Sequence, residues 1–147
     1  MSKVASAANT VGVSVDQMNA ILATTVSVTK QSPESVGVAY KTILARMTSI
    51  AAGEETEDGA TLASYTEKMY GFGINVLDAN NKLRDMGEVI EEIGGKWASM
   101  SREQQIALAQ VMAGTRQYNN LIALFDNWGM YEDALRTSAD AAGTLNK

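Results

Sequence analysis

The sequence predicts a mainly α-helical fold, a bundle of about six or seven helices with one small β-hairpin at about residues 74–84. Apolar residues recur every three or four positions through most of the 147 residues, and helix-start signals precede these stripes. Hydrophobic residues make up 46% of the chain and charged residues 20%, as in ordinary globular proteins. A chain of this size can bury one core without a metal or a disulfide.

Two capping boxes mark helix starts. In the first, Ser14 and Gln17 can satisfy each other's free backbone amides, and in the second Ser101 and Gln104 can do the same. The first box predicts a helix that runs to about Thr29. The second predicts a helix that ends at the glycine of residue 114.

Ser32 and Pro33 give the clearest helix start in the chain, because serine suits the N-cap and proline the first helical position. The helix that follows is expected to end near Gly53, where glycine can take the left-handed C-cap conformation. Its apolar stripe consists of Val36, Tyr40, Ile43, Leu44, Met47 and Ile50. A shorter helix is predicted over about residues 62–70.

The helical period stops at residue 74. Residues 74–77 are rich in β-forming side chains, residues 78–81 are turn formers, and residues 82–84 are predicted to return as the second strand. The spacing of Asp78 and Asn80 also matches the beginning of a calcium-binding loop. Because Lys82 stands where a third oxygen ligand belongs, the hairpin is the favoured interpretation.

Gly94 and Gly95 lie inside the next predicted helix, which Asp85 is expected to cap. Each glycine weakens a helix by roughly 1 kcal/mol relative to alanine. Either the helix ends there or another element packs very close to it. The apolar face of this helix consists of Val89, Ile90, Ile93 and Trp97.

The stretch from Ala113 to Trp128 joins two predicted helices through a polar corner. Thr115 is expected to cap the second helix, and Gly129 to close it after an apolar face that includes Trp128. A last, alanine-rich helix follows over about residues 131–145. The corner also echoes an earlier one: Leu22-Ala23 with Thr29-Lys30-Gln31 recurs as Leu108-Ala109 with Thr115-Arg116-Gln117. This echo hints at two helix–corner–helix halves, although chance explains it about as well as duplication.

The composition excludes several classes of function. The chain has no cysteine and no histidine, which removes disulfides, thiolate and imidazole metal sites and the common histidine-assisted nucleophiles. Its formal charge is −5 and its basic residues are scattered, so no direct nucleic-acid binding is expected. No stretch is long and apolar enough for a signal peptide or a membrane segment.

Clusters of acidic residues raise two possibilities for chemistry. Residues 53–59 place four acids between two glycines, but their spacing fits no calcium-loop template and an exposed acidic loop is favoured. Glu91 and Glu92 are adjacent in sequence, and glycosidases use a pair of carboxylates. On a helix they diverge by about 100°, so a solvated face is favoured. We predict no catalytic residue, no cofactor and no metal site.

Three blocks of the sequence resemble the globular region of the tail tape measure proteins of long-tailed bacteriophages and prophages. The first runs from Ala23-Thr24-Thr25-Val26 through Ala39-Tyr40-Lys41-Thr42 to Met47. The second runs from Gly73-Ile74-Asn75-Val76 to Gly87, with Trp97 downstream. The third, which is the most specific, is Ala113-Gly114-Thr115-Arg116-Gln117 with Asn120, Ala123-Leu124 and Asp126-Asn127-Trp128.

The resemblance implies a structural, non-enzymatic component of a phage or prophage tail. Such a protein sets tail length and guides tube assembly with tail tube subunits and tail assembly chaperones. It would lie in the lumen of the virion tail tube, and in the host cytoplasm during assembly; a homo-oligomer is possible. This chain departs from the family in being short, without a long heptad array or an apolar membrane segment. It is therefore expected to be a fragment that is not itself the ruler.

The resemblance also implies a division of the chain. Residues 1–12 would be the end of a preceding helix or a linker, residues 13–137 a single tape-measure-like helical domain, and residues 138–147 an alanine-rich helix end that continues into a missing region.

The third block supplies the candidate site residues, as a structural corner motif: Gly114, Thr115, Arg116, Gln117, Asn120 and Trp128. Arg116 is expected to tie the corner to a carboxylate or to helix-end carbonyls, while Asn120 and Trp128 fix the following helix. Alternatively, Arg116 and Gln117 contact a tube or chaperone subunit. Two other functions stay open: an accessory domain of a cell-wall hydrolase, and a generic helical partner-binding module.

Overall fold

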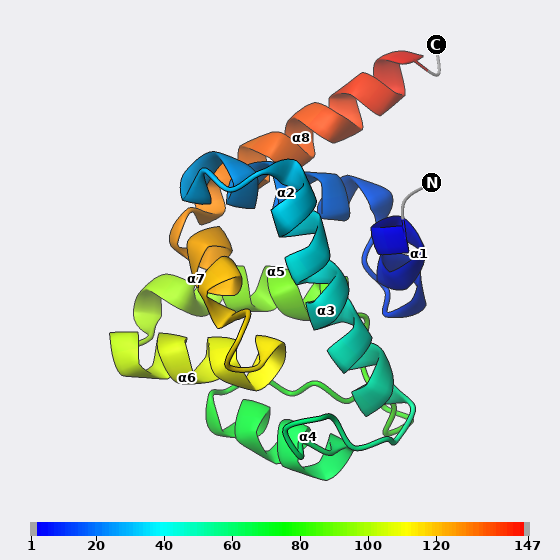
Figure 1. Ribbon diagram of the computed structural model, residues 1–147, viewed down its shortest axis with the longest axis vertical. Coiled ribbons are helices and arrows are strands. Elements are labelled where there is room, and N and C mark those ends of the chain that lie inside the picture. The colour runs from blue at the N-terminus through cyan, green and yellow to red at the C-terminus, as the bar shows by residue number, and fades with distance from the viewer. Residues whose placement is uncertain (1–2, 146–147) are drawn as a thin grey trace.

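The computed structural model describes the backbone of residues 3–145 and the side chains of residues 6–138. Within this part, eight α-helices and one 3-10 turn account for all regular structure, which confirms the mainly helical prediction (Figure 1). The elements are α1 (Lys3–Thr10), α2 (Val15–Thr29), α3 (Pro33–Ala51), α4 (Leu62–Gly71), α5 (Met86–Lys96), η1 (Trp97–Ser99), α6 (Arg102–Ala113), α7 (Tyr118–Asp126) and α8 (Trp128–Leu145).

Most helix starts lie where the sequence predicts them. The side chain of Ser14 accepts from the amide of Gln17, and the Gln17 side chain accepts from the amide of Ser14, so the first capping box is complete. The box of Ser101 and Gln104 is complete in the same way. Ser32 caps α3 by accepting from the amide of residue 35. These bonds satisfy donors that would otherwise be left free in the first helical turn.

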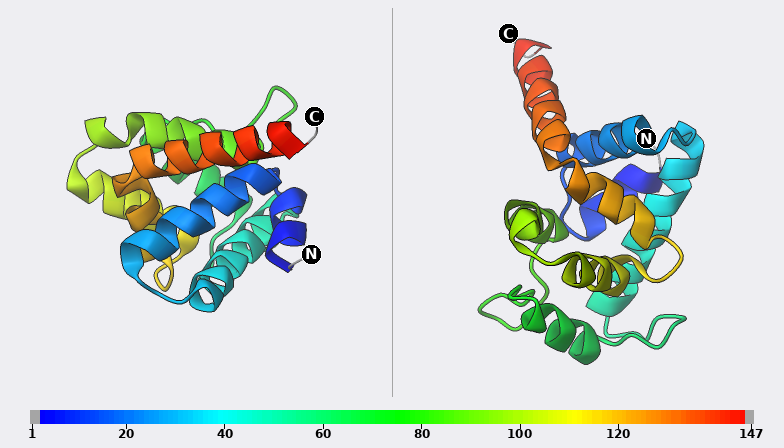
Figure 2. Two further views of the ribbon diagram at one scale, coloured as in Figure 1. Left: turned by 90° about the horizontal axis from the view of Figure 1, so that it is seen from above. Right: turned by 90° about the vertical axis from the view of Figure 1, so that its left-hand side faces the viewer.

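One continuous core joins all eight helices. Each contributes at least one side chain that is at most 4% exposed: Ala8, Met18, Ile43, Met69, Ile93, Leu108, Leu124 and Tyr131. In Figure 1, α2 and α8 form one end of the molecule, α4 forms the other, and α5, α6 and α7 lie between them. Figure 2 shows α8 running alongside α2, with its C-terminal half beyond the rest of the bundle.

The predicted hairpin at residues 74–84 is wrong, because these residues form no strand in the described chain. The segment does reverse direction, through a single antiparallel bridge between Leu77 and Leu83. Backbone bonds join the two arms, because the amide of Arg84 donates to the carbonyl of Val76 and the amide of Asp78 to that of Lys82, both at 2.8 Å. Two side chains add to them: Asn75 Oδ1 accepts from the amide of Leu77 at 3.1 Å, and Arg84 Nη1 donates to the carbonyl of Asn75 at 2.7 Å. A two-stranded ladder is marginal by itself, and these bonds hold the reversal without extending it into strands.

The turn between α1 and α2 packs against the start of α5. The amides of Met86 and Gly87 donate to the carbonyls of Val11 and Gly12, at 2.8 and 3.1 Å. A Cβ on Gly87 would lie 2.8 Å from the Gly12 carbonyl oxygen, so only glycine permits this approach. Asp85 is the N-cap residue as predicted, but its side chain makes no capping bond. Backbone carbonyls from the distant turn bond the first amides of α5 instead.

Candidate functional site

The two corners that echo each other in sequence meet in the structure. The α2–α3 corner ends in Gln31 and the α6–α7 corner ends in Gln117, and both glutamines bond the side chain of Asn120 on α7. Gln31 Nε2 donates to Asn120 Oδ1 at 2.9 Å, and Asn120 Nδ2 donates to Gln117 Oε1 at 3.1 Å. The side-chain amide of Asn120 thus accepts from one corner through its oxygen and donates to the other through its nitrogen, which fixes the two corners relative to each other.

The series of hydrogen bonds through Asn120 continues into the core. The hydroxyl of Tyr40 donates to the carbonyl of Asn120 at 3.1 Å and lies 2.9 Å from the hydroxyl of Thr25. Thr25 in turn donates to the carbonyl of Ile21. Burial raises the pKa of Tyr40, so it stays a neutral donor and acceptor. Helices α2, α3 and α7 are therefore joined by one hydrogen-bonded line that crosses the apolar core.

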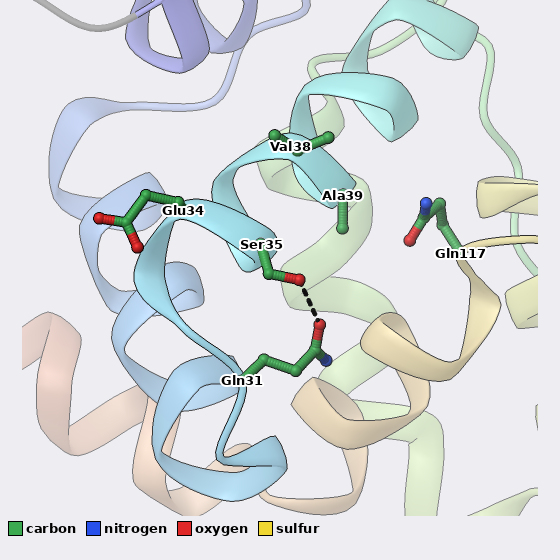
Figure 3. Close-up of a pocket in the computed structure, with 6 residues that line it drawn as sticks. All are labelled: Gln31, Glu34, Ser35, Val38, Ala39 and Gln117. Atoms are coloured by element: carbon green, nitrogen blue, oxygen red, sulfur yellow. Dashed lines mark hydrogen bonds between the residues drawn. The ribbon is translucent and has the colours of Figure 1, made fainter.

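A hollow of about 360 Å³ opens to solvent beside this line (Figure 3). Gln31 and Gln117 face it from the two corners, and Ser35 donates to Gln31 Oε1 at 2.9 Å. Glu34 and the 62% exposed Val38 lie along the same wall. The lining offers amide donors, amide acceptors and one carboxylate. It is suited to hydrogen bonding with a polar segment of another molecule, and contains no nucleophile paired with a base.

Arg46 of α3 makes the contacts that the sequence analysis assigned to Arg116. Its Nη2 donates to the carbonyl of Val111, near the end of α6, at 3.1 Å. Its Nη1 pairs with Asp58 and lies 3.4 Å from the hydroxyl of Thr56. The guanidinium thereby holds the acidic loop against the α6–α7 corner, and its side chain is only 12% exposed. The acidic loop is thus tied down by the part-buried guanidinium of Arg46.

The structure keeps residues 114–117 of the predicted corner motif along one hollow, and gives them roles other than those predicted. Gly114 ends α6 at φ +80°, with Arg46 packed over it. Thr115 does not cap α7, which begins at Tyr118 with Gln117 as its N-cap residue. Arg116 is exposed, and among the described side chains it has no hydrogen bond or ion pair. Of the motif, Gln117 and Asn120 lie at the site.

Trp128 lies apart from the corner, and the helix boundary near it differs from the prediction. Helix α7 ends at Asp126 and Trp128 begins α8, so Gly129 does not close a helix. The indole packs directly on Gly94 of α5, where a Cβ would lie 2.0 Å from the ring. Helix α5 continues through both glycines to Lys96. Gly94 therefore marks a close approach, one of the two outcomes that the sequence left open, while a Cβ on Gly95 would meet nothing within 4 Å.

A second polar cluster, which the sequence did not predict, joins the other ends of α6 and α7. Arg102 donates to both carboxylate oxygens of Asp126, at 2.8 and 3.1 Å, and Trp97 Nε1 donates to the same carboxylate at 2.9 Å. Gln105 completes the cluster by donating to the carbonyl of Trp97. The residues come from three elements, so no single helix period reveals them.

The acidic pair on α5 has structural partners. Glu91 accepts from the hydroxyl of Tyr131 at 3.1 Å. Glu92 is paired with Arg84 at 2.8 Å and with Lys96 at 3.1 Å. Burial opposes ionisation of Glu92, but the hydrogen bonds from these two bases outweigh it and hold its pKa below its usual range. A hydrolytic acid needs a raised pKa, so Glu92 does not fit the role of a glycosidase acid.

The acidic segments show no cation site in the described residues. No group of three or more acidic side chains there has the arrangement to hold a metal ion. Asp78 Oδ1 accepts instead from the amides of Asn80 and Lys82, at 2.8 and 3.1 Å, and so closes its own turn. Nor is any helix in this part of the chain long and apolar enough to span a bilayer.

Substitution of Asn120 tests the junction of the two corners. We expect Asn120→Ala to lower the free energy of unfolding by about 1–3 kcal/mol, because it leaves both part-buried glutamine amides without their partner. Urea denaturation measures the change. The control is Asn119→Ala: Asn119 is exposed on the same helix, so its effect should lie within about 0.5 kcal/mol. Equal effects at the two positions would contradict the assigned role of Asn120.

Stability should fall in acid, because three carboxylates have pKa values below their usual range. A hydrogen bond from Thr56 and then the Arg46 guanidinium lower the pKa of Asp58. For Asp126 and Glu92, hydrogen bonds from their basic partners outweigh the opposing effect of burial.

The unfolded chain binds more protons than the folded one as pH falls below the unfolded values of 3.8 and 4.5. We therefore expect a melting temperature that is steady above pH 5, roughly, and declines below it. Thermal scans from neutral pH downward test this, and Asp126→Asn should flatten part of the decline. A melting temperature that rises on acidification would contradict the predicted loss of stability in acid.

Comparison with known proteins supplies the family. The family of phage-related minor tail proteins matches residues 1–114, which is more than three quarters of the 147 residues. The match ends at Gly114, so it includes the first two resembling blocks and only the start of the third. No solved structure matches the chain. The matched part includes Gln31, Tyr40 and Arg46, the site residues that come from α3 and the corner before it. The chain belongs to the phage-related minor tail protein family.

Proposed function

We propose that this chain is a structural domain of a tail tape measure protein, the component of a long phage tail that sets tail length and scaffolds tube assembly. The family match carries the proposal, since minor tail proteins are structural parts of the tail. The order of the three resembling blocks adds to it. On this proposal, the domain lies in the lumen of the tail tube in the virion.

Its partners would be tail tube subunits and tail assembly chaperones, and we propose the rim of the corner as the surface that meets them. Arg116 lies beside Gln117 on the α6–α7 corner, exposed and unpaired among the described side chains, and it lines a second hollow together with the acidic loop. Glu34 and Val38 lie across the hollow on α3. An exposed guanidinium next to the glutamine amide of the rim is suited to a protein surface that offers a carboxylate or carbonyls.

Deleting the domain in frame from the phage that encodes it tests the tape measure role. We expect tails that are absent or of uncontrolled length in electron micrographs of the lysate. Tails of normal number and normal length would overturn the assignment.

Arg116→Ala tests the proposed contact surface. The purified variant should melt like the parent chain, while the phage carrying it should yield fewer complete tails. Lys82→Ala is the matched control, because Lys82 is also an exposed base, in the turn at residues 78–82. If Arg116→Ala assembles tails as well as Lys82→Ala does, the corner is not the contact surface, whatever the outcome of the deletion.

A further inference from the structure

Helices α7 and α8 are separated by one residue, Asn127. Its φ is −121° and its ψ is 40°, whereas a helical residue has values near −63° and −42°. The direction of the chain therefore changes at a single residue that is neither glycine nor proline. Gly129 follows two positions later, and a Cβ there would meet nothing within 4 Å.

The side chain of Asn127 replaces the hydrogen bond that a continuous helix would make at this point. In an unbroken helix, the amide of Asn127 would donate to the carbonyl of Ala123, four residues earlier. Here the amide donates to the carbonyl of Leu124 at 3.2 Å, and Asn127 Nδ2 donates to the carbonyl of Ala123 at 2.9 Å. The break thus leaves the Ala123 acceptor satisfied, and the donor that satisfies it belongs to one side chain.

The apolar pattern passes through the break without a change of phase. From α7 into α8 it steps by three and four residues alternately, through Leu121, Leu124, Trp128, Tyr131 and Leu135, and it resumes at Ala142 and Leu145 after the polar Ser138. In a continuous helix these positions would form one stripe. A boundary between two independent helices has no reason to keep this register. The sequence of residues 118–145 therefore suits one long helix as well as it suits two short ones.

Contacts with two other helices hold the bent form. Trp128 packs on Gly94 of α5 and stacks on Tyr131, with ring centroids 4.3 Å apart. The hydroxyl of Tyr131 donates to Glu91 of α5, and Ser138 donates to Asp16 of α2 at 2.7 Å. Apart from the bond of Asn127 itself, what favours the bend is the docking of α8.

We propose that residues 118–145 are a two-state element with Asn127 as its hinge. In the state seen here, α8 is docked on α2 and the chain is bent at Asn127. In the other, α8 has left α2 and α7 continues into it as one helix with a single apolar stripe. Any surface that covers the released stripe would favour the straight state, because a ligand shifts an equilibrium by its preference for one of the two states.

Pairs of spin labels test this in the whole chain, which has no cysteine of its own to compete for labelling. Asn119, Thr137 and Asn19 are exposed positions on α7, α8 and α2. Labels at 119 and 137 report the bend, since a continuous helix separates these positions by about 27 Å along its axis. Labels at 19 and 137 report the docking of α8 on α2.

Two substitutions should favour the straight state by different routes. Asn127→Ala removes the substitute hydrogen bond and adds a better helix former, so we expect the fraction near the 27 Å separation to rise by about tenfold. Gly94→Ala displaces Trp128 from its packing position on α5. Combined with Asn127→Ala, it should raise further the fraction of molecules near the separation of about 27 Å. Gly95→Ala is the control, because a Cβ there meets nothing within 4 Å.

The proposal is supported if, in Asn127→Ala, the 19–137 distance lengthens together with growth of the peak expected for a straight helix. Unchanged distributions for both pairs would overturn it. So would a lengthened 19–137 distance with a merely broadened 119–137 distribution, because α8 would then detach without joining α7. Far-ultraviolet circular dichroism with undiminished helix content confirms that each variant has stayed folded.

Discussion

Gly94→Ala should lower the free energy of unfolding by about 2–4 kcal/mol. The added methyl group would lie 2.0 Å from Cε2 and 2.3 Å from Cζ2 of Trp128, so the indole has to leave its position. Its displacement also disturbs the rings of Phe125 and Tyr131, whose centroids lie 5.7 and 4.3 Å from that of Trp128. Urea denaturation monitored by tryptophan fluorescence measures the loss.

The neighbouring glycine provides the control. Gly95 is exposed, and its substitution by alanine meets no atom within 4 Å. Gly95→Ala should therefore stabilise the chain, by up to about 1 kcal/mol, because alanine is the better helix former. Two adjacent glycines with opposite responses would establish the close packing of α8 on α5. Stabilisation by both substitutions would show that Trp128 does not pack where the structure has it.

Arg46→Ala should cost about 2–3 kcal/mol. It removes the donor to the Val111 carbonyl, releases Asp58 and Thr56, and uncovers Gly114. Arg46→Lys should recover only part of the loss, because an ammonium group lacks the planar fork that reaches these acceptors together.

Arg116→Ala is the matched comparison for this prediction, at the other arginine of the same region. Since Arg116 is exposed and has no partner among the described side chains, we expect a change within about 0.5 kcal/mol. Chemical denaturation of the four proteins, including the parent, ranks the effects. A larger loss from Arg116→Ala than from Arg46→Ala would restore the role that the sequence suggested for Arg116.

The positions of the helices could be predicted from sequence because their signals are local. A capping box such as that of Ser14 and Gln17 depends on residues three apart, and an apolar stripe on residues three or four apart. The hairpin failed for a related reason. Residues 74–77 have β-forming side chains, but the two arms pair at a single bridge, and the side chains of Asn75 and Arg84 bond the backbone beside it in an irregular form.

The site was only half predictable, because its contacts join residues far apart in the chain. The corner at residues 114–117 was identified, and so was its echo at residues 29–31. That both corners bond Asn120 depends on how α3 and α7 pack. Spacing in the sequence could not show either that Arg46, and not Arg116, ties the corner to a carboxylate and a carbonyl. A guanidinium at the end of a helix and one on a corner look alike in sequence, until the fold places the Val111 carbonyl within reach of Arg46.

The pairing of α2 with α8 also constrains how the protein can be made. Asp16 and Ser138 are bonded to each other across 122 positions of sequence. A ribosome releases α2 well before α8 has been synthesised, and the face of α2 that α8 covers stays open to solvent during that interval. Folding of this domain therefore completes only after α8 emerges. Chains that stop before Trp128 should therefore be digested faster by an added protease than chains that include α8.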